Sequence, residues 1–120
     1  MRPTSKAHES NEVAVVAPRG RITAGRAAEE FGAEAVRLLE NGRLGLVIDL
    51  TGVDRIDSNG LGVLVRICAL ARQLQARVVI MGWTMKTHGA LRLARLLAAF
   101  ELAGSREQAV FACVGSRTAG

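Results

Sequence analysis

The side chains best placed to do chemistry lie in one short stretch, Asp57-Ser58-Asn59-Gly60, shortly after an apolar run at residues 44–50. A serine at the start of a predicted helix has two uses. It can cap the helix, or it can accept a phosphate, which would face backbone N–H groups and the positive end of the helix dipole. Capping is the commoner use of such residues, and the two are compatible because a capping serine can also be phosphorylated. We therefore predict that Ser58 is the N-cap and a candidate phosphoacceptor.

Two glycines follow Ser58 closely. Gly60 and Gly62 leave little side chain near the start of the predicted helix. The backbone of a partner, or a nucleotide, could approach closely there.

Catalysis by this stretch has little support. A Ser-His-Asp triad needs a histidine near Ser58, but His8 lies in a polar N-terminal stretch and His88 at the start of a later helix. The carboxylates of Asp54 and Asp57 are more typical of surface groups that flank a turn than of an acid/base pair. The glycines lack the Gly-Lys-Ser or Gly-Lys-Thr of a phosphate-binding loop. We predict that the protein is not an enzyme.

Metal, cofactor and export signals are also lacking in the pattern. Cys68 and Cys113 lie far apart among apolar residues and read as small buried hydrophobes. The two histidines have no ligand-like spacing to them, so we expect neither a metal nor a cofactor. The start of the chain has no apolar signal segment, and no apolar span is long enough to cross a membrane. We expect a cytoplasmic protein with reduced thiols and no membrane insertion.

The first half of the chain must supply the elements that position Ser58. Two short β-branched runs at residues 13–16 and 20–23 flank Pro18-Arg19-Gly20, which favours a hairpin. From about residue 25 the apolar spacing becomes helical, and Asn41-Gly42 can end that helix. Residues 44–50 predict a buried central strand. A loop through Asp54, Arg55 and Ile56 then leads to the helix that opens at Asp57.

The second half repeats the alternation of strand and helix. Residues 77–81 predict another buried strand, and Thr84 can cap a helix over 85–99 with Leu93, Leu96 and Leu97 facing inward. Ser105 and Gln108 fit a capping box for a short helical turn. Residues 110–113 would form a last strand or sheet edge. The pattern predicts an α/β sandwich with a mixed sheet.

Composition agrees with a single domain of 120 residues. Apolar residues make up 49 %, which excludes a wholly disordered chain, and aromatic residues only 3 %, so the core must be aliphatic. The net charge is +5, from 16 basic and 11 acidic residues. The basic residues are scattered and lack interleaved aromatics, so we do not expect direct nucleic-acid binding. Arg66 and Arg72, on the helix after Ser58, are either solvated or a rim for an acidic partner.

These motifs resemble a known family. Asp49-Leu50-Thr51-Gly52-Val53, followed by Ile56-Asp57-Ser58-Asn59-Gly60-Leu61-Gly62-Val63-Leu64, is similar to the signature of STAS domains, and most of all to the bacterial anti-sigma factor antagonists. Gly20-Arg21-Ile22 and residues 78–81 extend the resemblance. It implies a STAS domain over 12–114, with a mobile tail at 1–11 and a loose one at 115–120. The implied fold has a mixed four- to five-stranded sheet with helices mainly on one face.

The resemblance also implies a function. Ser58 would be phosphorylated by an anti-sigma factor serine kinase, which the unphosphorylated protein binds, so that a sigma factor is released; a serine phosphatase would reset the cycle. Partner-binding residues would be Asp57, Ser58, Asn59, Gly60, Leu61 and Gly62. The alternative is a STAS subunit of a lipid-transport ABC system or of a larger sensory complex, with no phosphorylation. That protein would meet a transporter subunit instead of a kinase.

Overall fold

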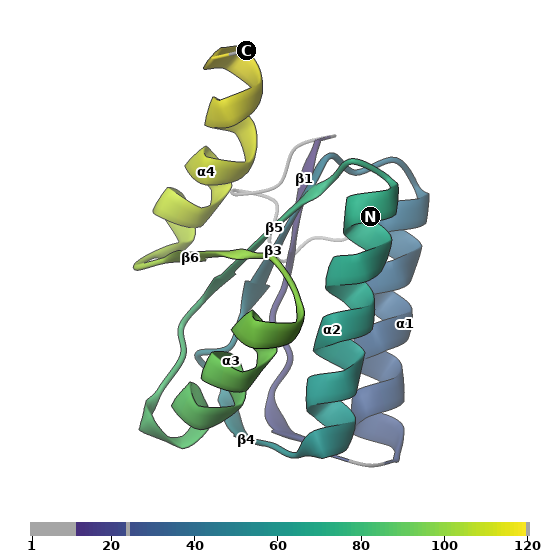
Figure 1. Ribbon diagram of the computed structural model, residues 1–120, viewed down its shortest axis with the longest axis vertical. Helices are drawn as coiled ribbons and strands as arrows, with labels where there is room; N and C mark the ends of the chain where they lie inside the picture. The colour runs from purple at the N-terminus through teal and green to yellow at the C-terminus, as the bar shows by residue number, and fades with distance from the viewer. Residues whose placement is uncertain (1–11, 24, 120) are drawn as a thin grey trace.

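A computed structural model describes residues 12–23 and 25–119, with side chains as far as Val114 (Figure 1). The N-terminal tail expected at residues 1–11 lies outside this described part. Two parallel sheets and four helices make up the structure. The strands are β1 (Val13–Val16), β2 (Gly20–Ile22), β3 (Gly45–Asp49), β4 (Val53–Ile56), β5 (Arg77–Met81) and β6 (Glu101–Ala103). The helices are α1 (Arg26–Glu40), α2 (Ser58–Gln73), α3 (Met85–Leu97) and α4 (Arg106–Ala119). The predicted α/β class is confirmed.

The hairpin predicted at the start of the chain is wrong. Strand β1 pairs in parallel with β3, with Val13 opposite Gly45 and Val16 opposite Ile48. Strand β2 leaves the main sheet and pairs in parallel with β4. The main sheet has the order β1-β3-β5-β6, and every pairing in the described chain is parallel rather than mixed. All four residues of β1 are buried, as expected of a strand that is covered on both faces.

Two strands have no clear signal in the sequence. Strand β4 was predicted to be a loop. Only Val53 of its four residues is buried, and Asp54 and Arg55 are exposed, so the segment lacks the apolar run of a buried strand. It is a strand because its backbone pairs with β2, not because of its side-chain pattern. Strand β6 has three residues and occupies the edge of the main sheet beside β5. Short edge strands of this kind carry little hydrophobic periodicity.

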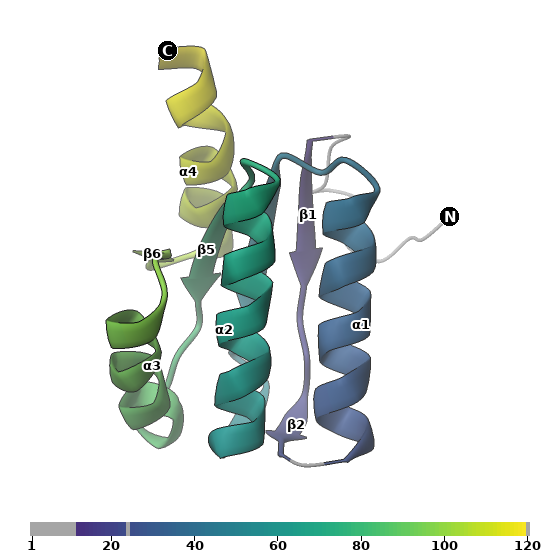
Figure 2. The ribbon, with the colours of Figure 1, turned by 45° about the vertical axis from the view of Figure 1, so that its right-hand side comes forward.

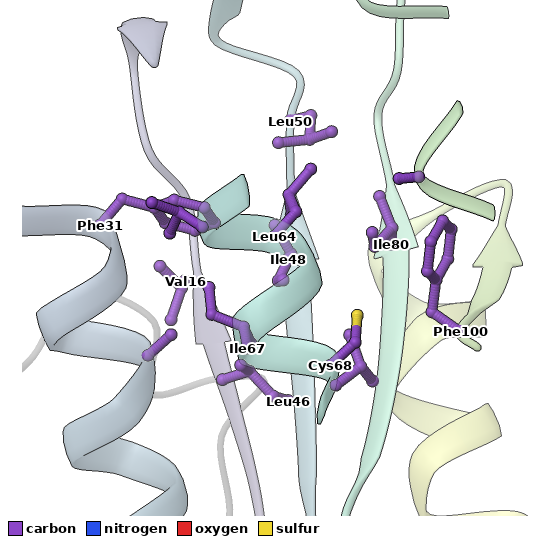
Figure 3. Close-up of a cluster of buried hydrophobic side chains, with 14 of the residues drawn as sticks. Val16, Phe31, Leu46, Ile48, Leu50, Leu64, Ile67, Cys68, Ile80 and Phe100 are labelled. Atoms are coloured by element: carbon purple, nitrogen blue, oxygen red, sulfur yellow. The ribbon is translucent and has the colours of Figure 1, made fainter. Parts of the chain in front are cut away.

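Three helices cover one face of the main sheet. Helices α1, α2 and α3 lie side by side in front of the strands, as Figure 2 shows. Their apolar sides close over Val16, Leu46, Ile48 and Ile80 of the strands (Figure 3). Leu64, Ile67 and Cys68 of α2 lie in the middle of this core. Helix α2 is thereby held firmly against the sheet, which fixes the position of its first turn.

Helix α4 covers the opposite face, where a last strand was predicted at residues 110–113. Ala109 and Cys113, four residues apart, pack together with Val15, Val47 and Val79. The apolar run misled the prediction because a short run does not distinguish a strand from a buried helix face. The Ser105 half of the predicted capping box is confirmed, since the Gln108 N–H donates to Ser105 Oγ over 3.1 Å. The other half differs, because Gln108 Oε1 accepts from the Gly104 N–H at 3.1 Å and not from that of Ser105. The helix continues to Ala119, so residues 115–119 are helical in backbone rather than loose.

Helix α3 has the predicted Thr84 cap but not the predicted inward face. Thr84 and Thr87 form a capping box, and Thr87, Leu91 and Ala94 are the buried side of the helix. Leu93, Leu96 and Leu97 are 48 %, 81 % and 62 % exposed, so their predicted inward orientation is wrong. The capping box fixes the rotation of the helix, and burial of Thr87 brings the residues four and seven positions later to the core.

The two cysteines are buried and free, as predicted. Burial raises the pKa of the Cys68 thiol to about 11, and the pKa of Cys113 is also raised to about 11, chiefly by burial. Among the described residues, no helix is both long and apolar enough to cross a membrane.

Candidate functional site

The first turn of α2 is the place that the sequence singles out, and two parallel strands position it. Strand β3 ends at Asp49, and after a short turn β4 runs beside β2 to Ile56. The Asp57 N–H donates to the Ile22 carbonyl over 3.4 Å, which ties the start of the helix to the end of β2. Ser58 therefore lies just beyond the carboxyl end of β4, next to the end of β2.

Asp57, rather than Ser58, is the N-cap of α2. Its backbone is extended, and its Oδ1 accepts hydrogen bonds from the N–H groups of Asn59 at 2.9 Å and Gly60 at 3.0 Å. The prediction of Ser58 as the cap was wrong by one residue. Both residue types are good N-caps, and only the backbone geometry decides which one is used. Ser58 becomes the first residue of the helix.

The hydroxyl of Ser58 faces solvent. Its side chain is exposed, and it has no hydrogen-bond partner in the part of the chain that the structure describes. The N–H groups of Asn59 and Gly60 already serve the Asp57 carboxylate, and the Leu61 N–H donates to the Asp57 carbonyl. A phosphate on Ser58 would thus meet a carboxylate at the helix start rather than the free N–H groups that we expected.

The two glycines of the motif have different surroundings. Gly60 is buried, and a Cβ atom built on it would overlap the Ile22 carbonyl oxygen and press on the side chains of Ile22 and Ile56. Gly60 therefore allows α2 to pack closely on β2 and β4. A Cβ atom on Gly62 would meet nothing within 4 Å. Of the two, Gly62 is the one that leaves open space for an approaching partner.

A shallow hollow of about 320 Å³ lies beside Ser58, between the first turns of α1 and α2. Ser58, Asn59 and Gly62 line one side, and Glu29 of α1 and Arg66 of α2 bring one charge of each sign. Leu61 is half-buried and packs against the core. Of the two arginines weighed on this helix, Arg66 belongs to the hollow, whereas Arg72 lines a different surface near α3.

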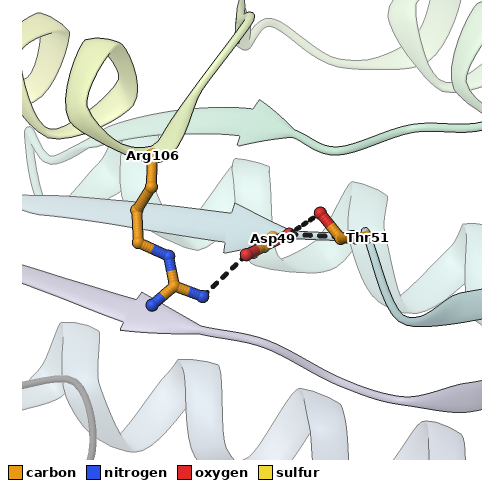
Figure 4. Close-up of polar contacts among 3 residues, drawn as sticks. All are labelled: Asp49, Thr51 and Arg106. Carbon is orange, nitrogen blue, oxygen red and sulfur yellow. Dashed lines mark hydrogen bonds and ion pairs between the residues drawn. The ribbon is translucent and has the colours of Figure 1, made fainter.

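A buried carboxylate, that of Asp49, lies at the end of β3, and no partner was predicted for it. Asp49 Oδ1 accepts from the Thr51 N–H at 2.9 Å and from Thr51 Oγ1 at 2.6 Å (Figure 4). Its Oδ2 accepts from Arg106 Nη2 of α4 at 2.7 Å. Burial alone would raise the pKa of Asp49, but the hydrogen bonds from Thr51 and Arg106 and the charge of Arg106 outweigh it and lower the pKa. These three residues join the end of β3, the turn between β3 and β4, and the start of α4.

The other residues weighed for catalysis do not gather at Ser58. Asp54 is exposed on β4, and His88 is exposed on α3, where it lines a separate groove. His8 lies outside the described residues. The structure thus brings Ser58 together with Asp57, Asn59 and Gly62, as the motif predicts, and adds Glu29 and Arg66, which no local motif indicates.

Comparison with known proteins identifies the family of the chain and solved structures that share its fold. A family model described as "Mlab, STAS domain" matches residues 5–105. The chain is 12 % identical to the anti-sigma factor antagonist SpoIIAA, solved in its unphosphorylated form, with a TM-score of 0.66 over 93 % of this chain and 94 % of that one. It is 19 % identical to the STAS domain of a SulP transporter from Vibrio cholerae, with a TM-score of 0.67 over 93 % and 88 %.

A third solved structure, the protein TM1081, is 21 % identical, with a TM-score of 0.65 over 81 % of this chain and 78 % of that one. No curated protein matches the sequence. At these identities the structural matches establish a shared fold.

Proposed function

The chain belongs to the STAS domain family, and from this premise we propose that it is an anti-sigma factor antagonist switched by phosphorylation of Ser58. In its unphosphorylated form it binds an anti-sigma factor serine kinase and so frees a sigma factor in the cytoplasm. The kinase then phosphorylates Ser58, the complex separates, and a serine phosphatase resets the protein. The chain itself binds and is modified, and it catalyses no reaction.

One observation carries this proposal. The Ser58 hydroxyl is exposed on the first turn of a rigidly packed helix, and no hydrogen bond within the described structure occupies it. A serine that served as the cap would have to leave its backbone partners before a kinase could use it. Here Asp57 has taken that role, so Ser58 can be modified while the helix keeps its cap.

Electrostatics supports the direction of the switch. A phosphate adds about −1.5 to −2 charges, directly beside the Asp57 carboxylate. The local surface would change from a neutral hydroxyl next to one carboxylate to a cluster of negative charge. A partner surface that fits the neutral hydroxyl would lose the contact through repulsion and through the cost of desolvating the phosphate.

A capture experiment with three proteins tests the proposal. Wild-type and Ser58→Ala protein should retain an ATP-binding serine kinase from a cell extract, and Ser58→Asp should retain much less. Gln73→Glu is the matched control, because it adds a negative charge to the exposed far end of the same helix. Equal capture of the kinase by Ser58→Asp and wild type would contradict the switch.

The second candidate is a STAS subunit of a lipid-transport ABC system or of a larger sensory complex. The likeness to the STAS domain of a SulP transporter and the net charge of +5 favour it. Under this function the captured protein would be a transporter or sensory subunit, and capture would not depend on the residue at position 58. Ser58 would then be only an exposed residue beside the helix cap.

A further inference from the structure

We infer that the groove beside α3 is a second docking site, which takes an acidic amphipathic helix of a protein partner. The groove has a volume of about 660 Å³ and lies between α3, Trp83 and the edge strand β6. It shares no lining residue with the hollow at Ser58. In Figure 2, α3 stands at the end of the row of helices, with α2 on one side and no described element on the other.

The groove is apolar where a partner would enter it. Its lining includes four large apolar side chains that are each more than a third exposed, namely Trp83, Leu93, Leu96 and Leu102. Leu91, which is buried, also lines it, so the groove reaches down to the core. Contiguous exposed side chains of this size mark interaction surfaces, and tryptophan is among the residues that most often dominate binding energy.

The charge of the lining indicates the kind of partner. Arg92 and Arg95 of α3 line the groove, and the lining contains no aspartate or glutamate. The guanidinium of Arg95 also lies over the Phe100 ring, 5.7 Å from its centroid. Glu101, which precedes Leu102 on β6, is engaged in an ion pair with Arg77. An apolar helix face flanked by carboxylates would satisfy both features, because its apolar side fills the groove and its flanks meet the arginines.

Other occupants fit less well. Two copies of this chain that met groove to groove would bring Arg92 and Arg95 against like charges. The terminal stretches at 1–11 and 115–120 are net basic and offer no run of large apolar residues. A bilayer surface is flat, whereas the apolar residues here surround a hollow. A protein helix is the occupant that combines acidic charge with side chains able to enter.

Trp83 is the chain's only tryptophan, so its fluorescence reports on the groove directly. The probe is a panel of designed helical peptides with leucine on one face and glutamate on the flanks, compared with versions that carry lysine in place of glutamate. The acidic peptides should shift Trp83 emission saturably, and the basic ones should bind roughly tenfold more weakly or not at all.

Variants locate the binding. Leu96→Ser should weaken binding of the acidic peptides by roughly tenfold. Because Leu96 is exposed, the substitution should leave the fold intact, which circular dichroism checks. Arg92→Glu should abolish the preference for acidic over basic peptides, because the new carboxylate offsets the charge of Arg95. Phe111→Ser is the matched control, since Phe111 is a large exposed residue on α4 outside the groove.

Four results would overturn the inference. The first is the absence of an emission shift with any acidic peptide. The second is equal binding of acidic and basic peptides, and the third is equal loss of binding in Leu96→Ser and Phe111→Ser. The fourth is an emission shift that arises without peptide, either on adding vesicles of phosphatidylglycerol and phosphatidylcholine or on concentrating the protein. Vesicles would identify a lipid surface as the occupant, and self-association would identify a second copy.

Discussion

Asp57 and Ser58 have separate roles at the start of α2, since Asp57 caps the helix and Ser58 is the proposed phosphorylation site. Asp57 holds the two N–H groups that a phosphate on Ser58 would otherwise use. Stability and modification therefore belong to adjacent residues. This division makes the contribution of each residue measurable by itself.

Asp57→Ala should destabilise the protein by about 1 kcal/mol, the usual cost of losing an N-cap. Ser58→Ala should change the free energy of unfolding by no more than about 0.5 kcal/mol, because Ser58 does not cap the helix. Urea denaturation of both variants measures this. Asp57→Asn, which keeps a side-chain acceptor, is the control for the cap. A larger loss in Ser58→Ala than in Asp57→Ala would contradict the assignment of the cap.

The two glycines of the motif give a second matched pair. Gly60→Ala should destabilise by about 1 to 3 kcal/mol, because the new methyl group would overlap the Ile22 carbonyl and force α2 away from β2. Gly62→Ala meets open space and should stabilise by about 0.5 to 1 kcal/mol through helix propensity. Thermal and urea unfolding decide between them. Equal effects at the two positions would show that α2 does not pack on β2 as described.

At the scale of elements, the Asp49 cluster joins β3 to α4 and stands directly behind the turn that leads to β4. Asp49 is the last residue of β3, and Arg106 is the first residue of α4. Their hydrogen bond at 2.7 Å crosses 57 residues of sequence. The cluster holds α4 on the second face of the sheet. The apolar contact there is small, because Ala109 and Cys113 are the buried apolar side chains that α4 supplies to it.

This cluster predicts a pH dependence of stability with a definite sign. The folded protein lowers the pKa of Asp49 below its ordinary value of 3.8. The ionised carboxylate therefore contributes stability that is fully present well above pH 3.8 and is lost as the pH falls through the lowered pKa. The difference in the free energy of unfolding between wild type and Asp49→Asn should shrink on acidification below about pH 4. A difference that grew in acid would contradict this arrangement.

The elements also show what the sequence can predict. The long periodic segments were found, namely α1, α2 and the buried strands β3 and β5, because burial imposes a strong pattern on them. Strands β4 and β6 were missed, as were the parallel pairings of β1 with β3 and of β2 with β4, since backbone pairing between distant segments leaves little trace in side-chain types. Residues 110–113 were taken for a strand because four apolar residues fit either element.

The same limit applies at the candidate site. The turn and its exposed serine were predicted from local composition. The cap was misplaced by one residue, because Asp57 and Ser58 are both suitable and backbone dihedrals decide. Arg66 was weighed only as a solvated residue or a rim for an acidic partner, and Glu29 and Arg106 received no role. Glu29 and Arg66 line the hollow because α1 packs on α2, and Arg106 reaches Asp49 because α4 packs on the sheet. Gly60 was expected to face a partner and instead faces Ile22.

At the scale of the whole molecule, two surfaces with different properties lie on the side covered by α1, α2 and α3. The hollow at Ser58 is small and carries one charge of each sign, whereas the groove at α3 is larger, apolar and basic. Since the helices are fixed by a common core, both surfaces are presented by a rigid frame. A single partner could touch both, or two partners could bind independently.

The exposed residues of the groove should contribute little to folding. Leu96→Ser and Arg92→Glu should each change the free energy of unfolding by no more than about 0.5 kcal/mol. Leu91→Ala, in contrast, removes a buried side chain of the same helix and should cost about 2 to 5 kcal/mol. Urea denaturation separates the two sides of α3. A large loss of stability in Leu96→Ser would show that this face packs against the protein itself.

The central claim is that Ser58 is the residue whose phosphorylation releases a kinase partner. The most direct measurement is to incubate the protein with ATP and the kinase that it captures, to locate phosphate by peptide mass spectrometry, and to compare the affinity of the kinase for both forms. The account predicts one phosphate, on Ser58, and binding of the phosphorylated protein that is weaker by tenfold or more. Phosphate on another residue with Ser58 unmodified, or equal affinity of the two forms, would contradict it.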